Sequence, residues 1–266
     1  MLDFINAAAY EDICDFSIIP QENKIFSKDI LYKDAIIFCK TDYINYLFDN
    51  LKGSFHRYIL VTHHSDYPID FYRFSMTPSC IKKWFAINVA YEHTDLIPIP
   101  IGLKTHRGVY LEKNIKTLWL SDNIDELINN EKDKEILYCN WSDTNPSRNL
   151  IIDKLKKNNI KYKVENNLCY ESYCENMSHH RFVISPPGNG LDNHRTWEAL
   201  YMGCIPIVIR NRIYEKWSGL PILEVDDYSE INENLLGDFP YKDHDKEKLY
   251  MSYWKKKILE ASKKHE

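Results

Sequence analysis

Two charged residues one helical turn apart, Arg195 and Glu198, follow a glycine-containing loop, and this order of residue types suits the binding of a phosphate group. Gly188 and Gly190 let the backbone turn tightly, and loop amides together with the positive end of a following helix favour an anion. Arg195 adds a permanent positive charge with forked donors, and the carboxylate of Glu198 can accept hydrogen bonds from vicinal hydroxyls such as those of a ribose. The alternative is a plain turn followed by an exposed Arg–Glu pair that contributes only about 0.2–0.5 kcal/mol.

The segment around these residues predicts a strand, a helix and a second strand. Residues 182–185 form an apolar run that is typical of a buried parallel strand, and the prolines and glycines of 186–190 end it. Asp192 or Asn193 can cap the following helix, whose buried face is marked by apolar residues at three- and four-residue spacing. Residues 205–209 supply the next strand, so a ligand is expected beyond the carboxyl ends of a βαβ unit.

Other polar residues of this segment have two possible roles. Asn189 and Asp192 can contact a bound sugar or simply shape the loop and cap the helix. His194 can contact a phosphate oxygen or a sugar hydroxyl, or be an ordinary surface residue. The candidate binding residues of this segment are Pro187, Gly188, Asn189, Gly190, Asp192, His194, Arg195 and Glu198.

A second cluster of candidate binding residues follows the strand predicted at 136–139. Thr144 or Asn145 can cap a helix over 145–157, and Arg148 then projects from its first turn toward the carboxyl edge of the sheet. Two arginines at neighbouring strand ends can neutralise much of the charge of a diphosphate without a metal ion. The alternative is a capped helix with a solvated arginine.

The loop after the strand predicted at 58–62 carries the candidate general base. Asp66 is the preferred base, because a carboxylate in a closed, water-poor cleft accepts a proton more readily than one in water. His63 or His64 is the second choice, since histidine exchanges protons near neutral pH. The alternative is that this loop only organises hydrogen bonds or binds an acceptor substrate.

The sequence does not predict a metal site. Asp243 and Asp245 form an Asp-x-Asp pair, but a turn-like segment precedes it where a metal-binding pair usually follows an apolar strand. The ten histidines show no HExxH spacing, and the seven cysteines form no CxxC pair. We therefore expect no catalytic zinc, and we interpret Cys39, Cys139 and Cys204 as small buried apolar residues.

Composition limits the class of protein. A hydrophobic fraction of 44% and an aromatic fraction of 14% over 266 residues suffice for two domains of modest size. The net charge of −5 provides no overall basic field, so we expect no nucleic-acid partner. No run approaches the ~20 apolar residues of a membrane span. The first residues also lack a secretion signal, so we expect a cytoplasmic protein.

The rest of the chain alternates between patterns of strands and helices, which favours parallel sheets and an α/β fold. A polar stretch over 123–134 indicates a domain boundary near residue 130. We expect one Rossmann-like domain over 1–130, a second over 131–245, and a terminal helix over 246–266 that braces the first. Further strands are predicted at 35–39, 96–101, 160–164 and 222–225, and helices at 43–51, 81–91, 170–178 and 228–236.

Several segments resemble exostosin-like, GT47-related glycosyltransferases and their relatives among the glycan enzymes of bacteria and large viruses. The similarity to the carboxyl-terminal half of this family lies in SPPGNGLDNHRTWEALYMGCIPIV at 185–208 and LPILEVDDYSEI at 220–231. Shorter similarities upstream are VTHHSD at 61–66, KWFAIN at 83–88, IPIPIGL at 97–103 and NWSDTNPSR at 140–148.

The resemblance implies a GT-B fold, in which two Rossmann-like domains with parallel sheets face each other across a cleft. It implies transfer of a hexose or pentose from a UDP- or GDP-linked donor, held mainly by the second domain, to a glycan hydroxyl. The resembled group largely inverts, and we expect no metal cofactor. Since many eukaryotic members carry a membrane anchor, the absence of one favours a bacterial or virus-infected cell. The alternatives are a non-catalytic nucleotide- or carbohydrate-binding module and a nucleotide-sugar epimerase.

Overall fold

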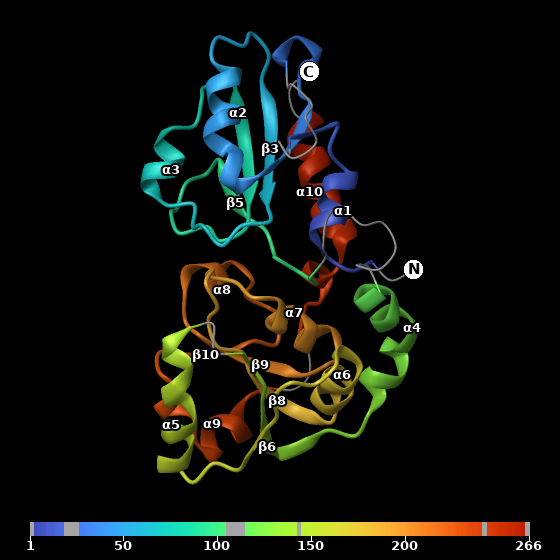
Figure 1. Ribbon diagram of the computed structural model, residues 1–266, viewed down its shortest axis with the longest axis vertical. Helices are drawn as coiled ribbons and strands as arrows, with labels where there is room; N and C mark the ends of the chain where they lie inside the picture. The colour runs from blue at the N-terminus through green and yellow to red at the C-terminus, as the bar shows by residue number, and fades with distance from the viewer. Residues whose placement is uncertain (1–2, 19–26, 105–114, 143–144, 241–243, 264–266) are drawn as a thin grey trace. The chain divides into compact units, whose positions relative to one another are not determined.

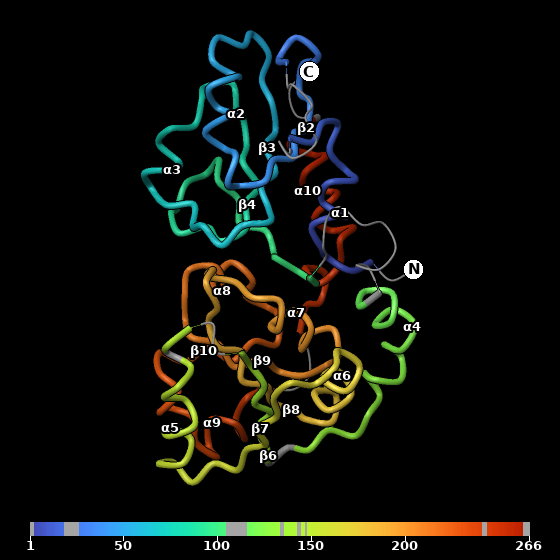
Figure 2. Tube along the Cα trace, viewed as in Figure 1, coloured from blue at the N-terminus to red at the C-terminus, as the bar shows by residue number. Residues whose placement is uncertain are grey.

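The chain folds into two units, each built on its own parallel sheet. The computed structural model describes residues 3–18, 27–104, 115–142, 145–240 and 244–263. The first unit comprises Asp3–Ile101 with Tyr250–Glu266, and the second comprises Met1–Leu2 with Gly102–Leu249 (Figure 1 and Figure 2). Sequence patterns put the change of domain near residue 130, whereas the internal contacts change over at Gly102.

The sheet of the first unit has five parallel strands that follow one another in chain order. Its central strand is buried along its whole length, as expected for a sheet with both faces covered. The strands are β1 (Phe16–Ile18), β2 (Ile36–Lys40), β3 (Tyr58–His63), β4 (Ile81–Ala86) and β5 (Leu96–Pro98).

The helix predicted at 81–91 is wrong, because residues Ile81–Ala86 form β4. The apolar spacing of this segment fits a helix face as well as a buried strand, and local pattern alone does not distinguish them. The pairing of this segment with neighbouring strands shows that it is a strand and not a helix. Strand β4 lies between β3 and β5, and the indole Nε1–H of Trp84 donates to Thr62 Oγ1 at 2.8 Å.

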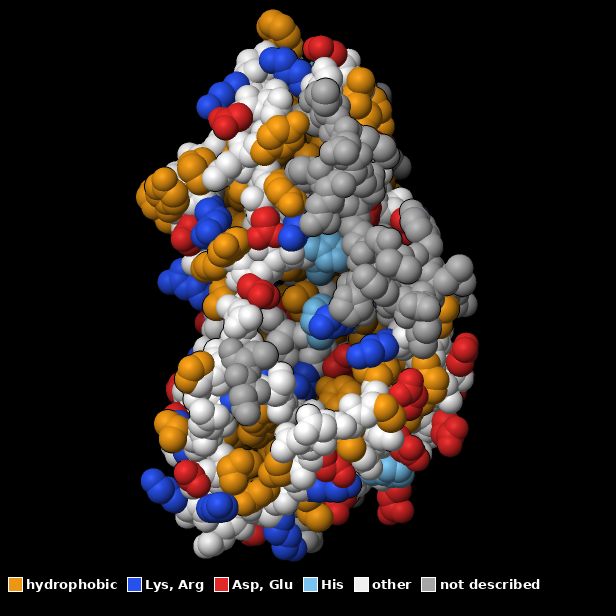
Figure 3. Space-filling model, viewed as in Figure 1, with side chains coloured by type: hydrophobic (Ala, Val, Ile, Leu, Met, Phe, Trp, Pro, Cys, Tyr) orange, Lys and Arg blue, Asp and Glu red, His pale blue; other side chains and the backbone are white. Residues whose placement is uncertain are grey.

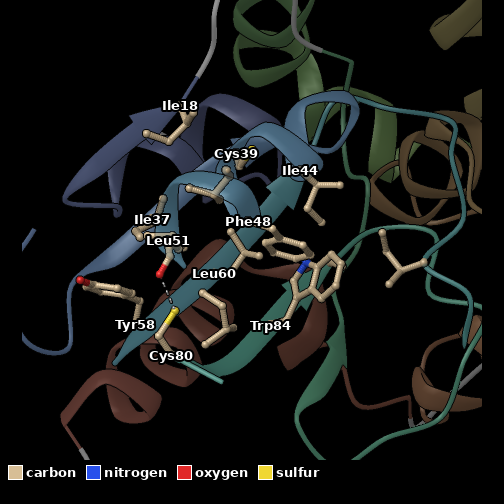
Figure 4. Packing of buried hydrophobic residues seen from close by; sticks show 14 of the residues in the cluster. Ile18, Ile37, Cys39, Ile44, Phe48, Leu51, Tyr58, Leu60, Cys80 and Trp84 are labelled. Atoms are coloured by element: carbon tan, nitrogen blue, oxygen red, sulfur yellow. Dashed lines mark hydrogen bonds between the residues drawn. The ribbon is translucent and has the colours of Figure 1, made fainter. Parts of the chain in front are cut away.

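Helices cover the first sheet and complete its core. The amphipathic helix α2 buries one face, and the ring of Phe48 meets that of Trp84 edge-on with centroids 5.6 Å apart (Figure 4). The terminal helix α10 packs on β3, and Ser262 Oγ donates to Asp34 O at 2.8 Å. The helices are α1 (Ala7–Asp12), η2 (Lys28–Ile30), η3 (Thr41–Tyr43), α2 (Ile44–Leu51), α3 (Phe71–Ser75) and α10 (Met251–Lys263).

The sheet of the second unit also has five parallel strands, but its order is β10-β9-β8-β6-β7. The chain passes from β6 out to β7 and then returns past β6 to β8. The order therefore reverses between β6 and β8, which is the position where doubly wound folds bind ligands. The strands are β6 (Asp133–Cys139), β7 (Tyr162–Val164), β8 (His180–Ile184), β9 (Ile205–Ile209) and β10 (Leu223–Val225).

Helices lie on both faces of the second sheet. In Figure 1, α5 and α9 lie on one side of it and α4 and α6 on the other. The helix predicted over 145–157 is divided into the 3-10 turn η4 and the helix α5. The helical elements are α4 (Ile115–Asn129), η4 (Pro146–Leu150), α5 (Ile151–Lys157), α6 (Tyr170–Ser178), α7 (His194–Tyr201), α8 (Arg212–Lys216), η5 (Tyr228–Glu230), α9 (Glu233–Asp238) and η6 (Glu247–Leu249).

The cysteines interpreted as buried apolar residues have that role. Cys39, Cys139 and Cys204 are fully buried or nearly so. Burial raises the pKa of the Cys139 thiol to about 12, although the charge of Arg195 acts in the opposite direction. The thiol therefore stays protonated at neutral pH and packs as a small apolar group.

Candidate functional site

The two clusters of predicted binding residues in the second unit follow neighbouring strands. Strands β6 and β8 pair in parallel, with Cys139 opposite Ile184 at their carboxyl ends. The glycine loop at 186–190 follows β8, and the segment that leads to Arg148 follows β6. Both clusters consequently lie at the point where the strand order reverses.

Arg148 contacts the glycine loop through hydrogen bonds from its guanidinium to main-chain carbonyls. Its side chain is only 5% exposed, and its guanidinium donates to three main-chain carbonyls. Nη1 donates to Ser142 O at 2.7 Å, Nε to Pro187 O at 3.1 Å and Nη2 to Pro186 O at 3.4 Å. Asn145 Nδ2 donates to the next carbonyl, that of Gly188, at 2.8 Å. The alternative of a solvated Arg148 is wrong, and these bonds favour a role in positioning the loop.

The start of α7 is fixed by polar residues that the sequence presented as alternatives. Asn193 is the N-cap, because its Oδ1 accepts from Thr196 N at 3.2 Å. Asp192 is buried, and its carboxylate accepts from the indole Nε1–H of Trp197 at 2.9 Å and from Asn193 N at 2.8 Å. The carboxylate of Asp192 therefore shapes the helix entrance, which favours the capping alternative over contact with a sugar.

Arg195, in the first turn of α7, forms no ion pair with a carboxylate of the described residues. Its side chain is half-buried, and its Nε lies in the interior without a hydrogen-bond partner among the described residues. An unpaired buried donor is costly, so the position calls for an acceptor. Burial raises the pKa of the Tyr228 phenol, and the charges of Arg195 and Arg148 both act against that rise.

Glu198 lies one turn beyond Arg195 and is only 8% exposed, so the alternative of an exposed Arg–Glu pair is wrong. Its Oε2 accepts from the hydroxyl of Tyr173, on α6, at 2.9 Å. Within the described part of the chain, Oε1 accepts no hydrogen bond and no ion pair joins the carboxylate to Arg195. One carboxylate oxygen is therefore held by the protein and the other is open to a ligand.

The remaining predicted residues of this site differ in their surroundings. The ring nitrogen Nδ1 of His194 lies 2.7 Å from Gly102 O, which ties the start of α7 to the beginning of the second unit. Asn189 is exposed, and Gly190 is half-buried in the same loop. Thr144 lies outside the described residues.

His63, at the end of β3, has both ring nitrogens engaged. Nδ1 accepts from the main-chain N–H of His64 at 2.8 Å, which places the proton on Nε2. Nε2 then donates to Ile101 O at 3.2 Å, and the ring is buried. This arrangement favours a structural role for His63. His64 is half-buried and has a left-handed backbone with φ of 61°.

Asp66 is exposed, so the first unit does not by itself provide the water-poor surroundings expected for a base. The loop that carries it is held by Asn88, whose role the sequence did not indicate. Asn88 is buried in a left-handed conformation with φ of 54°, and its Nδ2 donates to Ser65 O at 2.9 Å. Asparagine tolerates this conformation better than most residues, which was the available signal.

The described residues contain neither a cluster of metal-binding side chains nor a helix suited to a membrane span. Within it, no three His, Cys, Asp or Glu side chains gather as they would around a metal ion. Asp243, of the Asp-x-Asp pair, lies outside the described residues. None of the helices that the structure describes is both long and apolar enough for a membrane span. On the face drawn in Figure 3, basic and acidic side chains are interspersed.

The two units are Rossmann-like α/β units with parallel five-stranded sheets, as in the GT-B fold, and the candidate anion site lies at the strand reversal of the second. Residues 128–232, all of them in the second unit, match the family model of the Exostosin GT47 domain. This part of the chain is thus similar to an exostosin-like glycosyltransferase domain, which confirms the expected resemblance and fold class. A search of curated proteins found no significant match.

Proposed function

We propose that the protein transfers a sugar from a UDP- or GDP-linked donor to a hydroxyl group of a glycan, without a metal ion and with inversion at the anomeric carbon. The observation that carries this proposal is the buried Nε of Arg195, which has no hydrogen-bond partner among the described residues and follows a glycine loop at the strand reversal of the second unit. A nucleoside diphosphate supplies an acceptor for this guanidinium.

The reaction explains why a fixed cation is needed there. The acceptor oxygen forms a bond to the anomeric carbon while the bond from that carbon to the diphosphate oxygen breaks. The electron pair leaves with the diphosphate, so negative charge grows on the phosphate oxygens. A guanidinium that binds the diphosphate stabilises the charge as it develops, which is the basis for proposing that no metal is required.

The other residues of the second unit have supporting roles in this proposal. Amides of the glycine loop bind phosphate oxygens, and Arg148 and Asn145 hold that loop through its carbonyl groups. The open oxygen of Glu198 accepts hydrogen bonds from the ribose hydroxyls of the donor. The ribose and the diphosphate are therefore each assigned a charged side chain of α7, Glu198 and Arg195 respectively.

Asp66 is proposed as the base that takes the proton of the acceptor hydroxyl. A single carboxylate base suits one in-line displacement, which inverts the anomeric carbon. Its exposure requires that bound substrates exclude water from it before the reaction. His63 is less suited to this role because both of its ring nitrogens are already engaged.

Calorimetry with a panel of nucleoside diphosphates tests the binding part of the proposal. We expect Arg195→Ala to weaken the best ligand by about 10- to 100-fold, since one hydrogen bond to a charged group is lost. Arg210→Ala is the matched control, because Arg210 forms an exposed ion pair with Asp226 in the same unit. Replacement of Mg²⁺ or Mn²⁺ by EDTA should leave the affinity unchanged. If no nucleoside diphosphate binds, or if Arg195→Ala binds as tightly as wild type, the site is wrongly assigned.

A binding module without turnover is the second candidate function. It is favoured by the exposure of Asp66 and by the engagement of both nitrogens of His63. A screen of nucleotide sugars with glycan acceptors separates the two functions. Transfer or donor hydrolysis that Asp66→Asn abolishes excludes the binding module, whereas nucleotide binding with no turnover of any donor favours it.

A further inference from the structure

A buried tyrosine contacts the carboxylate that we assign to the ribose. Tyr173, on α6, is almost fully buried, and its hydroxyl donates to Glu198 Oε2 at 2.9 Å. The two residues come from different helices, which pack against each other. The sequence pattern marked Tyr173 only as part of a helix.

The hydrogen bond has a directional consequence for Glu198. The terminal torsion of a glutamate is broad, so an unrestrained carboxylate samples many orientations. When one oxygen is fixed by Tyr173, the direction of the other follows from the planar geometry of the group. Among the described residues Oε1 has no hydrogen-bond partner, so the oxygen that is directed in this way is the one available to a ligand.

The surroundings of Tyr173 keep its phenol protonated, so its hydroxyl remains a hydrogen-bond donor. Burial is the main cause that raises the pKa of the Tyr173 phenol far above its ordinary value, and the charge of Glu198 adds to it. The charge of Arg195 acts in the opposite direction. A phenol that stays protonated throughout the neutral range donates to the carboxylate and cannot replace it as an acceptor.

We propose that Tyr173 is a positioning residue for the nucleotide, which orients Glu198 so that its open oxygen accepts hydrogen bonds from the vicinal hydroxyls of the ribose. This inference rests on the proposed function, because it takes the ligand of Glu198 to be the ribose of a nucleotide sugar. It identifies how a ribonucleotide is distinguished from a nucleotide that lacks these hydroxyls.

The test compares Tyr173→Phe with wild type on two ligands. The dissociation constants of UDP and GDP are measured by calorimetry, together with those of their 2′,3′-dideoxy counterparts. Tyr201→Phe is the matched control, because its hydroxyl donates to Leu249 O at the same 2.9 Å and it lies on the same helix as Glu198. Both variants lose one buried hydroxyl, so a purely structural effect is common to both.

We expect wild type and Tyr201→Phe to prefer the ribonucleotide by about 10-fold or more, as for a hydrogen bond to a charged group. Tyr173→Phe should reduce this ratio to less than about 3-fold, while its affinity for the dideoxy ligand changes little. A full ribonucleotide preference in Tyr173→Phe overturns the inference and leaves the proposed function intact. Equal binding of both ligands by wild type overturns the assignment of Glu198 to the ribose, and the inference with it.

A second variant covers the case in which Tyr173→Phe does not fold. Glu198→Asp keeps the negative charge but shortens the side chain, which withdraws the carboxylate from the Tyr173 hydroxyl. We expect it to lose the ribonucleotide preference to the same degree. An unchanged preference in Glu198→Asp shows that the bond to Tyr173 does not orient the binding oxygen, and this result also overturns the inference.

Discussion

Replacement of Arg148 by alanine distinguishes a loop-positioning arginine from one that binds the diphosphate directly. In the structure the guanidinium donates at 2.7 Å to Ser142 O and at 3.1 Å to Pro187 O, with a longer bond of 3.4 Å to Pro186 O. A hydrogen bond to a charged group contributes ~1.5 kcal/mol at the lower end of its range, so the two shorter bonds together contribute about 3 kcal/mol. We give the longest bond no weight.

This loss of stability should be visible in the thermal unfolding of the second unit. For a domain of this size, a loss of about 3 kcal/mol lowers Tm by roughly 6–12 °C. Differential scanning calorimetry measures the change, with Arg210→Ala as the control, because exposed ion pairs contribute only about 0–1 kcal/mol. Arg148→Lys should recover part of the loss, since an ammonium group reaches fewer of the carbonyls.

The opposite pattern refutes the reasoning. If Arg148→Ala unfolds within about 2 °C of wild type but loses nucleotide affinity as strongly as Arg195→Ala, the guanidinium is used by the ligand and not by the loop. In that case the bonds to the main-chain carbonyls contribute little, and the original assignment of Arg148 to the diphosphate is the better one.

Two further predictions concern the separate units. Burial lowers the pKa of His180, and its hydrogen bond to the backbone of Asn176 offsets this shift only in part. Below pH ~6.5 the unfolded chain therefore binds more protons than the folded chain, so the free energy of unfolding falls as the pH is lowered. Urea denaturation at pH 7 and pH 5 should show this fall in wild type and a weaker one in His180→Gln, and an equal fall in both would exclude His180 as its source. Asn88→Ala should lower the free energy of unfolding by about 1–2 kcal/mol through a strained left-handed backbone, while Asn88→Gly should cost less because glycine adopts this conformation freely. Equal losses in the two variants would show that the bond to Ser65 O, and not the backbone, stabilises this loop.

Local signals in the sequence were sufficient for the βαβ segment of the second unit. The apolar run of β8, the glycine loop and the capping residues before α7 are all recognised within a few residues of one another. The exostosin-like phrases overlap this segment, and the family match covers it. The fold class was therefore predictable, and the position of the anion site stays a prediction of the same local signals.

Local signals were insufficient where two local structures fit the sequence equally well and tertiary packing determines which one forms. Residues Ile81–Ala86 carry apolar spacing compatible with a helix, and only their place between two other strands makes them β4. The same holds for His63, whose ring is engaged by Ile101 O, 38 residues away. No pattern within the loop itself indicates that bond.

The sequence by itself determined which charged groups stand at the carboxyl ends of the strands, because strand, turn and cap signals act over three or four residues. The tertiary structure decided what each group does. Arg148 turns to carbonyls 38 and 39 residues away, and Glu198 is held by Tyr173, 25 residues away. Arg195 is left without a partner among the described residues. Such assignments depend on which helices pack together, since a side chain can bond only to groups that the completed fold brings within about 3 Å of it.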